Sequence, residues 1–144
     1  MKTATVFRLS ISANKGEKKR NVSKVTFDEK LGIIGDAHGT SERQISLLPI
    51  ESFGKLQAPD LVINPGDFAE NVTTIDLDFS KISIGTRLQL GSEAQIEIMQ
   101  IGKECHENCI IREKVGDCIM PREGVFGRVL RSGTVRVGEN ITIL

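Results

Sequence analysis

The sequence predicts a mostly β protein, built as a small closed or partly open β-barrel with a few short helices. Short apolar runs alternate with polar residues at a period of two, and turns rich in Gly, Asn and Ser separate them at intervals of about 8–12 residues. Helical periodicity is scarce along the 144 residues. A chain of this length buries a sufficient core without a disulfide or metal, so we expect one domain over residues 1–144.

Strands are predicted where the alternation is clearest. Phe7, Leu9 and Ile11 share a face of the first, and the turn 91–93 joins two later ones. Pro49 opens PIESFGKL, which predicts a two-turn helix because proline suits the first helical position. The predicted strands cover residues 4–11, 22–27, 43–48, 81–90, 94–101, 125–130 and 134–144, with the last two forming a hairpin series around turns at 131–133 and 138–140.

Charge and composition exclude several function classes. The 19 basic and 19 acidic residues give a formal net charge of zero, which removes the electrostatic footprint of a nucleic-acid or anionic-membrane binder. The first residues, MKTATVFRLSIS, lack the apolar core of a signal peptide, and no run approaches the roughly 20 apolar residues of a membrane span. We therefore expect a cytoplasmic protein that binds neither nucleic acid nor membrane.

All three cysteines, Cys105, Cys109 and Cys118, lie between Gly102 and Arg128. Three cysteines in a reducing cytosol do not make a disulfide framework, which leaves reactive thiols, metal ligands or buried apolar residues. Cys105 and Cys109 stand at i and i+4 in a stretch of helix-forming residues and would share one face of a helix. Cys105 also falls where a predicted strand passes into that helix, a junction at which free amides and nearby cations favour a thiolate.

A zinc site is an alternative for the same residues. The spacing C-x3-C-x8-C beside His106 offers three sulfurs and one imidazole, although a structural zinc site usually has tight cysteine pairs at both ends. Buried, unreactive cysteines remain a further alternative, because free cysteine is among the most buried residue types.

Polar side chains cluster in three other loops. Residues 14–21, NKGEKKRN, are a solvated connector or a clamp for phosphate. The run LGIIGDAHG at 31–39 predicts a hairpin turn with Asp36 and His38 on the surface, or a His38 that faces the site. Residues 61–74 place two carboxylates and an amide after a Pro-Gly turn, either for acid/base chemistry and hard cations or to cap backbone groups of the loop.

The order of these segments resembles the MOSC domain, the module named for the C-terminal part of molybdenum cofactor sulfurases. The resemblance runs across nearly the whole chain. It rests on GDAHG (35–39), RQISLL (43–48), PGDFAEN (65–71), IGTRLQLG (84–91), QIGKECHENC (100–109), MPREGVFGRVL (120–130) and GTVRVGENI (133–141). It implies a β-barrel with a few short helices and a cysteine that carries sulfur or ligates the molybdenum of a bound pterin. This cysteine follows the strand ending near Ile101, so the role falls on Cys105.

The sequence departs from the family pattern in two respects. Cys109 and Cys118 are additional thiols, and no segment corresponds to the N-terminal β-barrel extension of the amidoxime-reducing members. Cofactor handling is therefore favoured over substrate reduction.

The predicted function is binding of a molybdenum cofactor (molybdopterin), with sulfur carriage or transfer through Cys105 and assistance from Cys109. The expected partner is a cofactor-biosynthesis protein or a molybdoenzyme; a zinc module and a storage module without turnover remain alternatives. A pterin phosphate needs cations and backbone amides, and we expect His38, Asp67, Glu70 and Arg122 to converge on the cleft of Cys105. The predicted cofactor-binding residues are Lys15, Lys18, Lys19, His38, Arg43, Asp67, Glu70, Asn71, His106 and Arg122.

Overall fold

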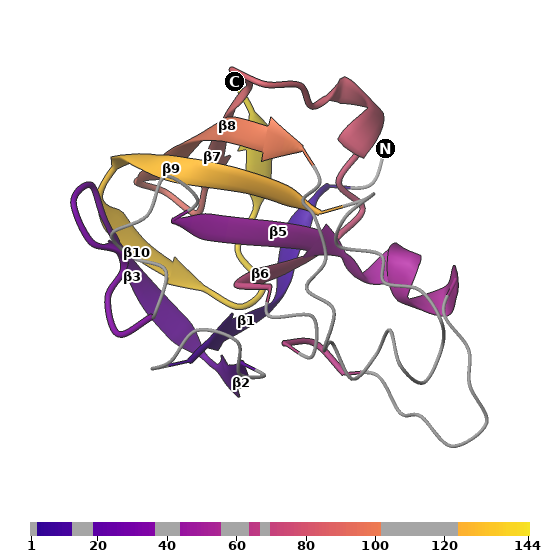
Figure 1. Ribbon diagram of the computed structural model, residues 1–144, viewed down its shortest axis with the longest axis horizontal. Helices are drawn as coiled ribbons and strands as arrows, with labels where there is room; N and C mark the ends of the chain where they lie inside the picture. The colour runs from indigo at the N-terminus through magenta and orange to yellow at the C-terminus, as the bar shows by residue number, and fades with distance from the viewer. Residues whose placement is uncertain (1–2, 13–18, 37–43, 56–63, 67–69, 102–123) are drawn as a thin grey trace.

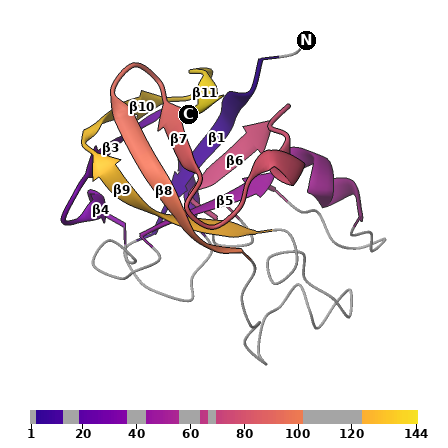
Figure 2. The ribbon, with the colours of Figure 1, turned by 90° about the horizontal axis from the view of Figure 1, so that it is seen from above.

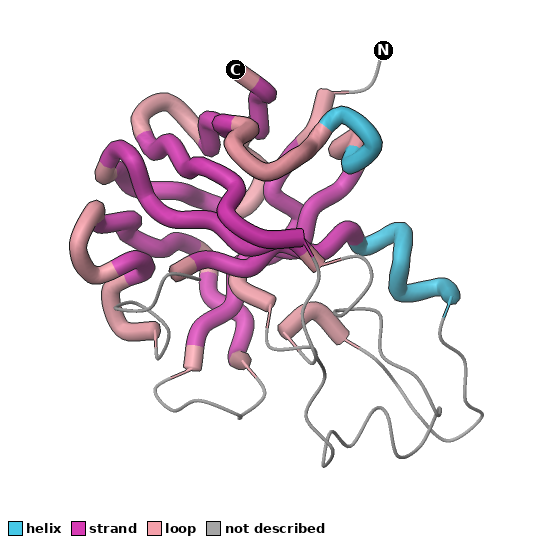
Figure 3. The backbone as a smooth tube through the Cα atoms, turned by 45° about the horizontal axis from the view of Figure 1, so that its top comes forward, coloured by secondary structure: helices cyan, strands magenta, loops and turns pink. Residues whose placement is uncertain are grey.

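The computed structural model describes residues 3–12, 19–36, 44–55, 64–66, 70–101 and 124–144. These residues are mostly β, as the sequence predicts, and the short helices lie at the periphery of the strands (Figure 3). The 3-10 helices are η1 (Ile50–Lys55) and η2 (Phe79–Lys81). The strands are β1 (Thr5–Ile11), β2 (Arg20–Val22), β3 (Lys24–Asp28), β4 (Gly32–Ile33), β5 (Ile45–Pro49), β6 (Val72–Ile75), β7 (Arg87–Leu90), β8 (Ala94–Ile101), β9 (Val125–Arg131), β10 (Gly133–Arg136) and β11 (Ile141–Ile143).

The strands form two open sheets. The larger has the order β11-β7-β8-β9-β5-β6-β1-β2, and the smaller has the order β10-β3-β4 (Figures 1 and 2). The larger sheet is mixed, because β5 and β6 run parallel while its other pairs are antiparallel.

The prediction was a closed or partly open β-barrel with a mostly β composition. The mostly β class is confirmed and the closed form is wrong, because the sheets are open and the larger one is mixed. Strand β1 pairs with β6 along Thr5–Leu9 and with β2 along Leu9–Ile11, and among the described strands none extends the β2 side of β1 before Leu9. Among the described residues, the link between the two edges is the isolated bridge from Thr5 to Asn140, with backbone hydrogen bonds on either side.

Several predicted elements are confirmed and others are corrected. The hairpin of β7 and β8 pairs Leu90 with Ala94, as the turn signal predicts. The strand predicted at 81–90 begins only at Arg87, because Asp78 caps η2 and Gly85 turns the chain with a φ of 95°. The helix predicted after Pro49 is the 3-10 helix η1.

The C-terminal hairpin series is wrong. Strands β9 and β10 lie in different sheets, and β10 and β11 do not pair with each other, since β10 pairs with β3 and β11 with β7. Strand β6 was not predicted at all.

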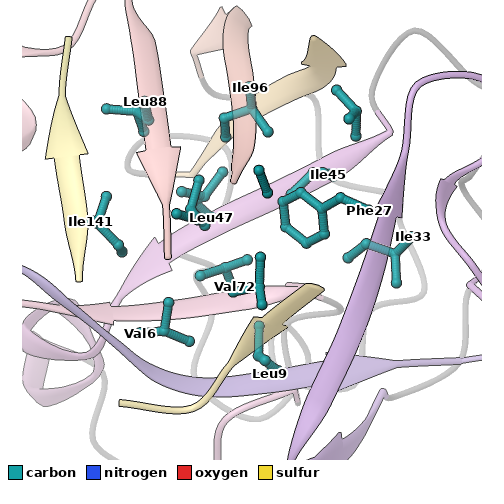
Figure 4. Packing of buried hydrophobic residues seen from close by; sticks show 14 of the residues in the cluster. Val6, Leu9, Phe27, Ile33, Ile45, Leu47, Val72, Leu88, Ile96 and Ile141 are labelled. Atoms are coloured by element: carbon teal, nitrogen blue, oxygen red, sulfur yellow. The ribbon is translucent and has the colours of Figure 1, made fainter. Parts of the chain in front are cut away.

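One hydrophobic core joins the two sheets. Phe27 from β3 and Ile33 from β4 belong to the same buried cluster as Ile45 and Leu47 from β5, and Figure 4 shows these side chains pointing into a common interior. Burying a side chain of this size stabilises the fold by about 1.5–3 kcal/mol. The smaller sheet is therefore held against the larger one by packing.

A continuous row of paired residues crosses six strands of the larger sheet. Each residue in the row is the register partner of the next: Ile101, Val125, Leu47, Val72, Leu9 and Val22. The four in the middle are buried in the core. Since neighbouring strands lie about 4.8 Å apart, the row fixes the spacing between the end of β8 and the strands β6 and β1.

Candidate functional site

Polar side chains are buried where β1, β2, β5 and β6 meet. We call this set the buried polar cluster; in each member the side chain is inaccessible or nearly so. Its members are Ser10, Ser12, Lys19, Asp36, Ser46, Glu70, Asn71 and Thr73. Buried polar groups require hydrogen bonds, and the hydrogen bonds of this cluster connect the strands and turns from which its members come.

Asn71 links three strands. Its side-chain oxygen accepts hydrogen bonds from the Ser46 amide (3.0 Å) and the Ser46 hydroxyl (3.2 Å), and its Nδ2 donates to the Ser10 carbonyl (3.2 Å). The backbone of Asn71 bonds the same two residues, because its N–H reaches the Ser46 carbonyl (3.1 Å) and its carbonyl accepts from the Ser10 amide (2.8 Å). The side chain thus completes the strand pairing of β5 and β1 at the point where β6 begins.

Lys19 forms a buried ion pair with Asp36. The Lys19 Nζ lies 2.7 Å from Asp36 Oδ1, and both side chains have 0% exposure. The Lys19 ammonium also donates to the Ser12 hydroxyl at 3.2 Å, and the Ser12 amide donates to the same Asp36 oxygen at 3.1 Å. The pair therefore joins the end of β1, the residue before β2 and the turn after β4.

The turn at Gly66 is packed against this ion pair. The Lys19 amide donates to the Gly66 carbonyl at 3.0 Å. A Cβ at Gly66 would lie 2.3 Å from the Lys19 carbonyl oxygen and 3.0 Å from the Ser10 hydroxyl, and the φ of this residue is 96°. Only glycine allows both the positive φ and this close approach.

Glu70 is a buried carboxylate at the base of β6. Its exposure is 0%, and its Oε2 accepts a hydrogen bond of 2.7 Å from the Thr73 hydroxyl. An ionised carboxylate is expensive to bury without compensating contacts. Because Glu70 directly precedes Asn71, its position is set by the same strand junction.

The buried polar cluster contains described residues that flank three stretches of the chain outside the described residues. Ser12 and Lys19 bound residues 13–18, Asp36 precedes residues 37–43, and Gly66 and Glu70 bound residues 67–69. The bonds described above join these flanking residues to one another. Ile101, the last described residue before 102–123, pairs with Val125, which lies just after that stretch, and the row of paired residues continues through Leu47 to β6 and β1.

Three of the predicted site residues lie within this cluster, namely Lys19, Glu70 and Asn71. The others fall outside the described residues: Lys15, Lys18, His38, Arg43, Asp67, Cys105, His106, Cys109 and Arg122, together with Cys118. The convergence of His38, Asp67, Glu70 and Arg122 on the cleft of Cys105 therefore stays a prediction.

Sequence reasoning missed the serines of the cluster, and it placed Asp36 on the surface as one of two alternatives. That placement is wrong for the Asp36 side chain, which is fully buried against Lys19. Ser10 and Ser46 lie within predicted strands, and nothing in their spacing distinguishes them from solvent-facing positions. The one available signal was Asn71 after a Pro-Gly turn, which is typical of a residue that caps backbone groups.

No three His, Cys, Asp or Glu side chains group as a metal site within the part of the chain that the structure describes. In those same ranges, no helix has the length and apolar character needed to cross a membrane.

Comparison with known families identifies the chain. The model of the MOSC domain matches residues 35–142, so the protein belongs to the MOSC domain family. This match begins at the turn before Asp36 and includes the whole stretch that carries the three cysteines. The family is associated with the molybdenum cofactor. No curated protein matches the chain.

Solved structures are similar in fold. The YuaD protein of Bacillus subtilis superposes with a TM-score of 0.80 at 23% identity, over 97% of this chain and 94% of that one. YiiM from Geobacillus stearothermophilus gives 0.72 at 17% identity, over 98% and 75%. YiiM from Escherichia coli gives 0.64 at 20% identity, over 95% and 69%. At these identities the likeness concerns the fold alone.

Proposed function

We propose that this MOSC protein binds a molybdenum cofactor of the molybdopterin type and carries or transfers sulfur through Cys105, in cofactor maturation or delivery. The observation that carries the proposal is the match of the MOSC model across the segment with all three cysteines. A cofactor-biosynthesis protein or a molybdoenzyme is the partner that such a role requires, and we place both in the cytoplasm.

The described residues are compatible with a bound anionic cofactor. The buried polar cluster joins described residues that flank the segments carrying Lys15, Lys18, His38, Arg43 and Asp67. A site assembled from several loops needs such fixed ends, because binding is strongest when the contacting groups are held in position beforehand. The hydrogen bonds of the cluster hold the described residues next to these segments in position.

The donor set also suits the metal. Soft thiolate ligands are the ones that proteins use for soft or sulfur-bound metals, and three cysteines stand in one segment. When bound, a molybdenum cofactor supplies a redox-active metal in a sulfur-rich environment. Cys105 would hold the metal or the sulfur, Cys109 would assist, and the cations Lys15, Lys18, Arg43 and Arg122 would neutralise phosphate, with His106 close to the thiols in sequence.

The chemistry assigned to Cys105 depends on its thiolate. Only the thiolate is an effective nucleophile or metal ligand, and cations lower the pH at which it forms. A persulfide at this position would be formed when the Cys105 thiolate attacks the outer sulfur of a donor persulfide and displaces the donor thiolate. An acceptor thiolate would then attack the outer sulfur of the Cys105 persulfide, so that this sulfur passes to the acceptor and the Cys105 thiolate leaves. Cys109 is the nearest thiol in sequence to serve that exchange.

The test is the alkylation rate of the thiols as a function of pH, combined with equilibrium binding of molybdopterin. We expect the wild-type protein to show one fast-reacting thiol and measurable binding, and Cys105→Ser to lose both. Cys118→Ser is the matched control, with binding and the fast thiol retained. If Cys105→Ser keeps both the fast thiol and full affinity, Cys109 or a zinc site has to be considered instead. Detection of catalytic turnover distinguishes an enzyme from a storage protein.

A further inference from the structure

The smaller sheet has an exposed polar face. Strands β3 and β10 pair along their length, and their valines, Val25 and Val135, are buried in the core. Successive side chains of a strand point to opposite faces, so the residues next to these valines point away from the core. We call this surface the outer face of the smaller sheet; its residues on the two strands are Lys24, Thr26, Thr134 and Arg136. Three of them are exposed and Thr134 is half-buried, and the two strands lie on the side of the molecule away from η1 (Figures 1 and 2).

Two cations of the outer face stand opposite each other, because Lys24 is the register partner of Arg136. The next pair, Ser23 and Val137, shares a backbone hydrogen bond of 3.1 Å, and the Arg136 amide donates to Glu139 Oε1 instead of to β3. Lys24 and Arg136 therefore form a pair without backbone hydrogen bonds between them, in which side chains stand closest, with about 4.5–5.5 Å between the Cβ atoms. Like charges in this arrangement destabilise a sheet.

Carboxylates near these cations are bonded to the backbone. Neither Lys24 nor Arg136 forms an ion pair within the part of the chain that the structure describes. The Asp28 carboxylate, at the end of β3, accepts from two amides of the following turn at 2.8 and 2.9 Å. The Glu139 carboxylate accepts from the Arg136 amide at 2.8 Å.

The larger sheet arranges its exposed charges differently. Arg87 and Arg128 are both register partners of Glu97, and Arg128 Nη2 lies 2.8 Å from Glu97 Oε1. Cations of the larger sheet thus stand opposite a carboxylate, whereas the two cations of the smaller sheet are open to an anionic group from another molecule.

An aliphatic side chain adjoins the cations. The Ile34 amide donates to the Thr26 carbonyl at 3.1 Å, and Ile34 is 51% exposed whereas Ile33 is 1% exposed. Ile34 thus continues the row of Thr134 and Thr26 across the outer face. Charges beside an apolar side chain on a sheet face suit a protein partner, because small ligands prefer concave sites and a net charge of zero disfavours nucleic acid and membranes.

We propose that the outer face of the smaller sheet is a docking surface for an acidic segment of a partner protein. Carboxylates of the partner pair with Lys24 and Arg136, and an apolar side chain beside them contacts Ile34. Complementary charge contributes more to association rate and orientation than to affinity, so the contact is weak and sensitive to salt. This docking surface goes beyond the proposed function and does not depend on it, since it uses no residue of the predicted cofactor site.

The probe is a synthetic peptide that contains two glutamates and a leucine, compared with the same peptide carrying glutamines in place of the glutamates. Binding is followed by NMR on the isotopically labelled full chain. We expect the glutamate peptide to shift the resonances of the outer face, at Lys24, Thr26, Ile34, Thr134 and Arg136, and the glutamine peptide to leave them unchanged.

Variants test the two charges separately. Lys24→Gln and Arg136→Gln should each weaken binding of the glutamate peptide about threefold, and the double variant about tenfold, as is typical of exposed charge pairs. Arg87→Gln is the matched control, because Arg87 is an exposed cation on a strand and stands opposite Glu97; it should bind as wild type does.

Several results would overturn the docking surface. These are equal binding of the two peptides, no shift at millimolar peptide, shifts confined to other surfaces, or unchanged affinity in the double variant. The same shifts with inorganic phosphate at equal concentration would mark a small-anion site instead. Self-association in analytical ultracentrifugation that the double variant loses would mark a contact between two copies of the chain.

Lys24→Glu separates docking from a structural role of the lysine. This change places unlike charges opposite each other, so it should raise the urea midpoint by about 0.1–0.5 M and abolish binding of the glutamate peptide. If Lys24→Glu lowers the midpoint instead, the Lys24 charge serves the fold and the proposal is wrong.

Discussion

Replacement of Asn71 tests whether this predicted ligand is first of all a structural link. Asn71→Ala removes the acceptor of the Ser46 amide and the donor to the Ser10 carbonyl, which lie 3.0 and 3.2 Å from the Asn71 side chain. A buried backbone group left without its partner costs about 1–3 kcal/mol. The two groups together predict a loss of about 4 kcal/mol in the free energy of unfolding.

The orientation of the amide is fixed by its neighbours. The side-chain oxygen faces an N–H donor at Ser46 and the nitrogen faces a carbonyl at Ser10, so a flipped amide would place like groups together. Asn71→Asp should therefore also be destabilising, because it sets a carboxylate oxygen against the Ser10 carbonyl and buries a charge. That loss should shrink in acid, where the carboxyl group is protonated.

The assay is urea unfolding followed by circular dichroism. With a slope of about 2 kcal/mol per M, a loss of about 4 kcal/mol lowers the midpoint by about 2 M. Asn21→Ala is the comparison variant, because it removes one acceptor only, that of the buried Ser10 hydroxyl; its effect should be about 1–2 kcal/mol. A change of under about 1 kcal/mol for Asn71→Ala, with cofactor binding abolished, would refute the structural account and make Asn71 a direct ligand.

Three further predictions follow from single positions. Thr74→Val should raise the free energy of unfolding by about 1 kcal/mol, because the buried Thr74 hydroxyl has no hydrogen-bond partner in the described structure; the neighbouring Thr73→Val should lower it, because that hydroxyl donates to a buried carboxylate. Gly66→Ala should lower the free energy of unfolding by about 3 kcal/mol and Gly138→Ala by about 1 kcal/mol, measured by thermal or urea unfolding. Both glycines have a positive φ, but a Cβ at Gly138 meets nothing within 4 Å. Equal losses would show that the close contact at Gly66 is unimportant. The pKa of Asp78 is lowered from 3.8, chiefly by the hydrogen bond from the Ser80 side chain. The contribution of Asp78 to the free energy of unfolding is therefore present above pH 3.8 and is lost as the pH falls through the lower pKa of the folded state. Asp78→Asn should lose less stability in acid than wild type does, and parallel pH profiles of the two proteins would contradict this.

Alternation predicted most of the strands, including β5 and β9, but it predicted the correct pairing only where two strands are close in the chain. Strands β7 and β8 follow one another across a tight turn, and alternation together with Gly91 was enough to find them. Alternation does not specify a distant partner, and for this reason β10 and β11 were assigned to a hairpin although they pair with β3 and β7. Strand β6 is short, directly follows the loop at Glu70 and pairs in parallel with β5, an arrangement for which the local sequence carries no turn signal.

The sequence predicted which polar residues belong to the candidate site, such as Lys19, Glu70 and Asn71, but it did not predict that their side chains are buried. A run of basic residues is usually solvated, and the partner that draws Lys19 inside, Asp36, lies 17 positions further along the chain. One prediction was that side chains after the Pro65-Gly66 turn cap backbone groups. The Asn71 side chain does so, because it bonds the Ser46 amide and the Ser10 carbonyl. The roles of Cys105 and Cys109 rest on their place after β8 and on family membership.

Metal and pterin analysis of protein produced in a host that makes molybdenum cofactor tests the central proposal most directly. Wild type and Cys118→Ser should carry molybdenum and a pterin in equal amounts, or a mass increase of one sulfur atom on the segment with Cys105, and Cys105→Ser should carry neither. Zinc in place of molybdenum, or an undiminished molybdenum and pterin content in Cys105→Ser, would contradict the account.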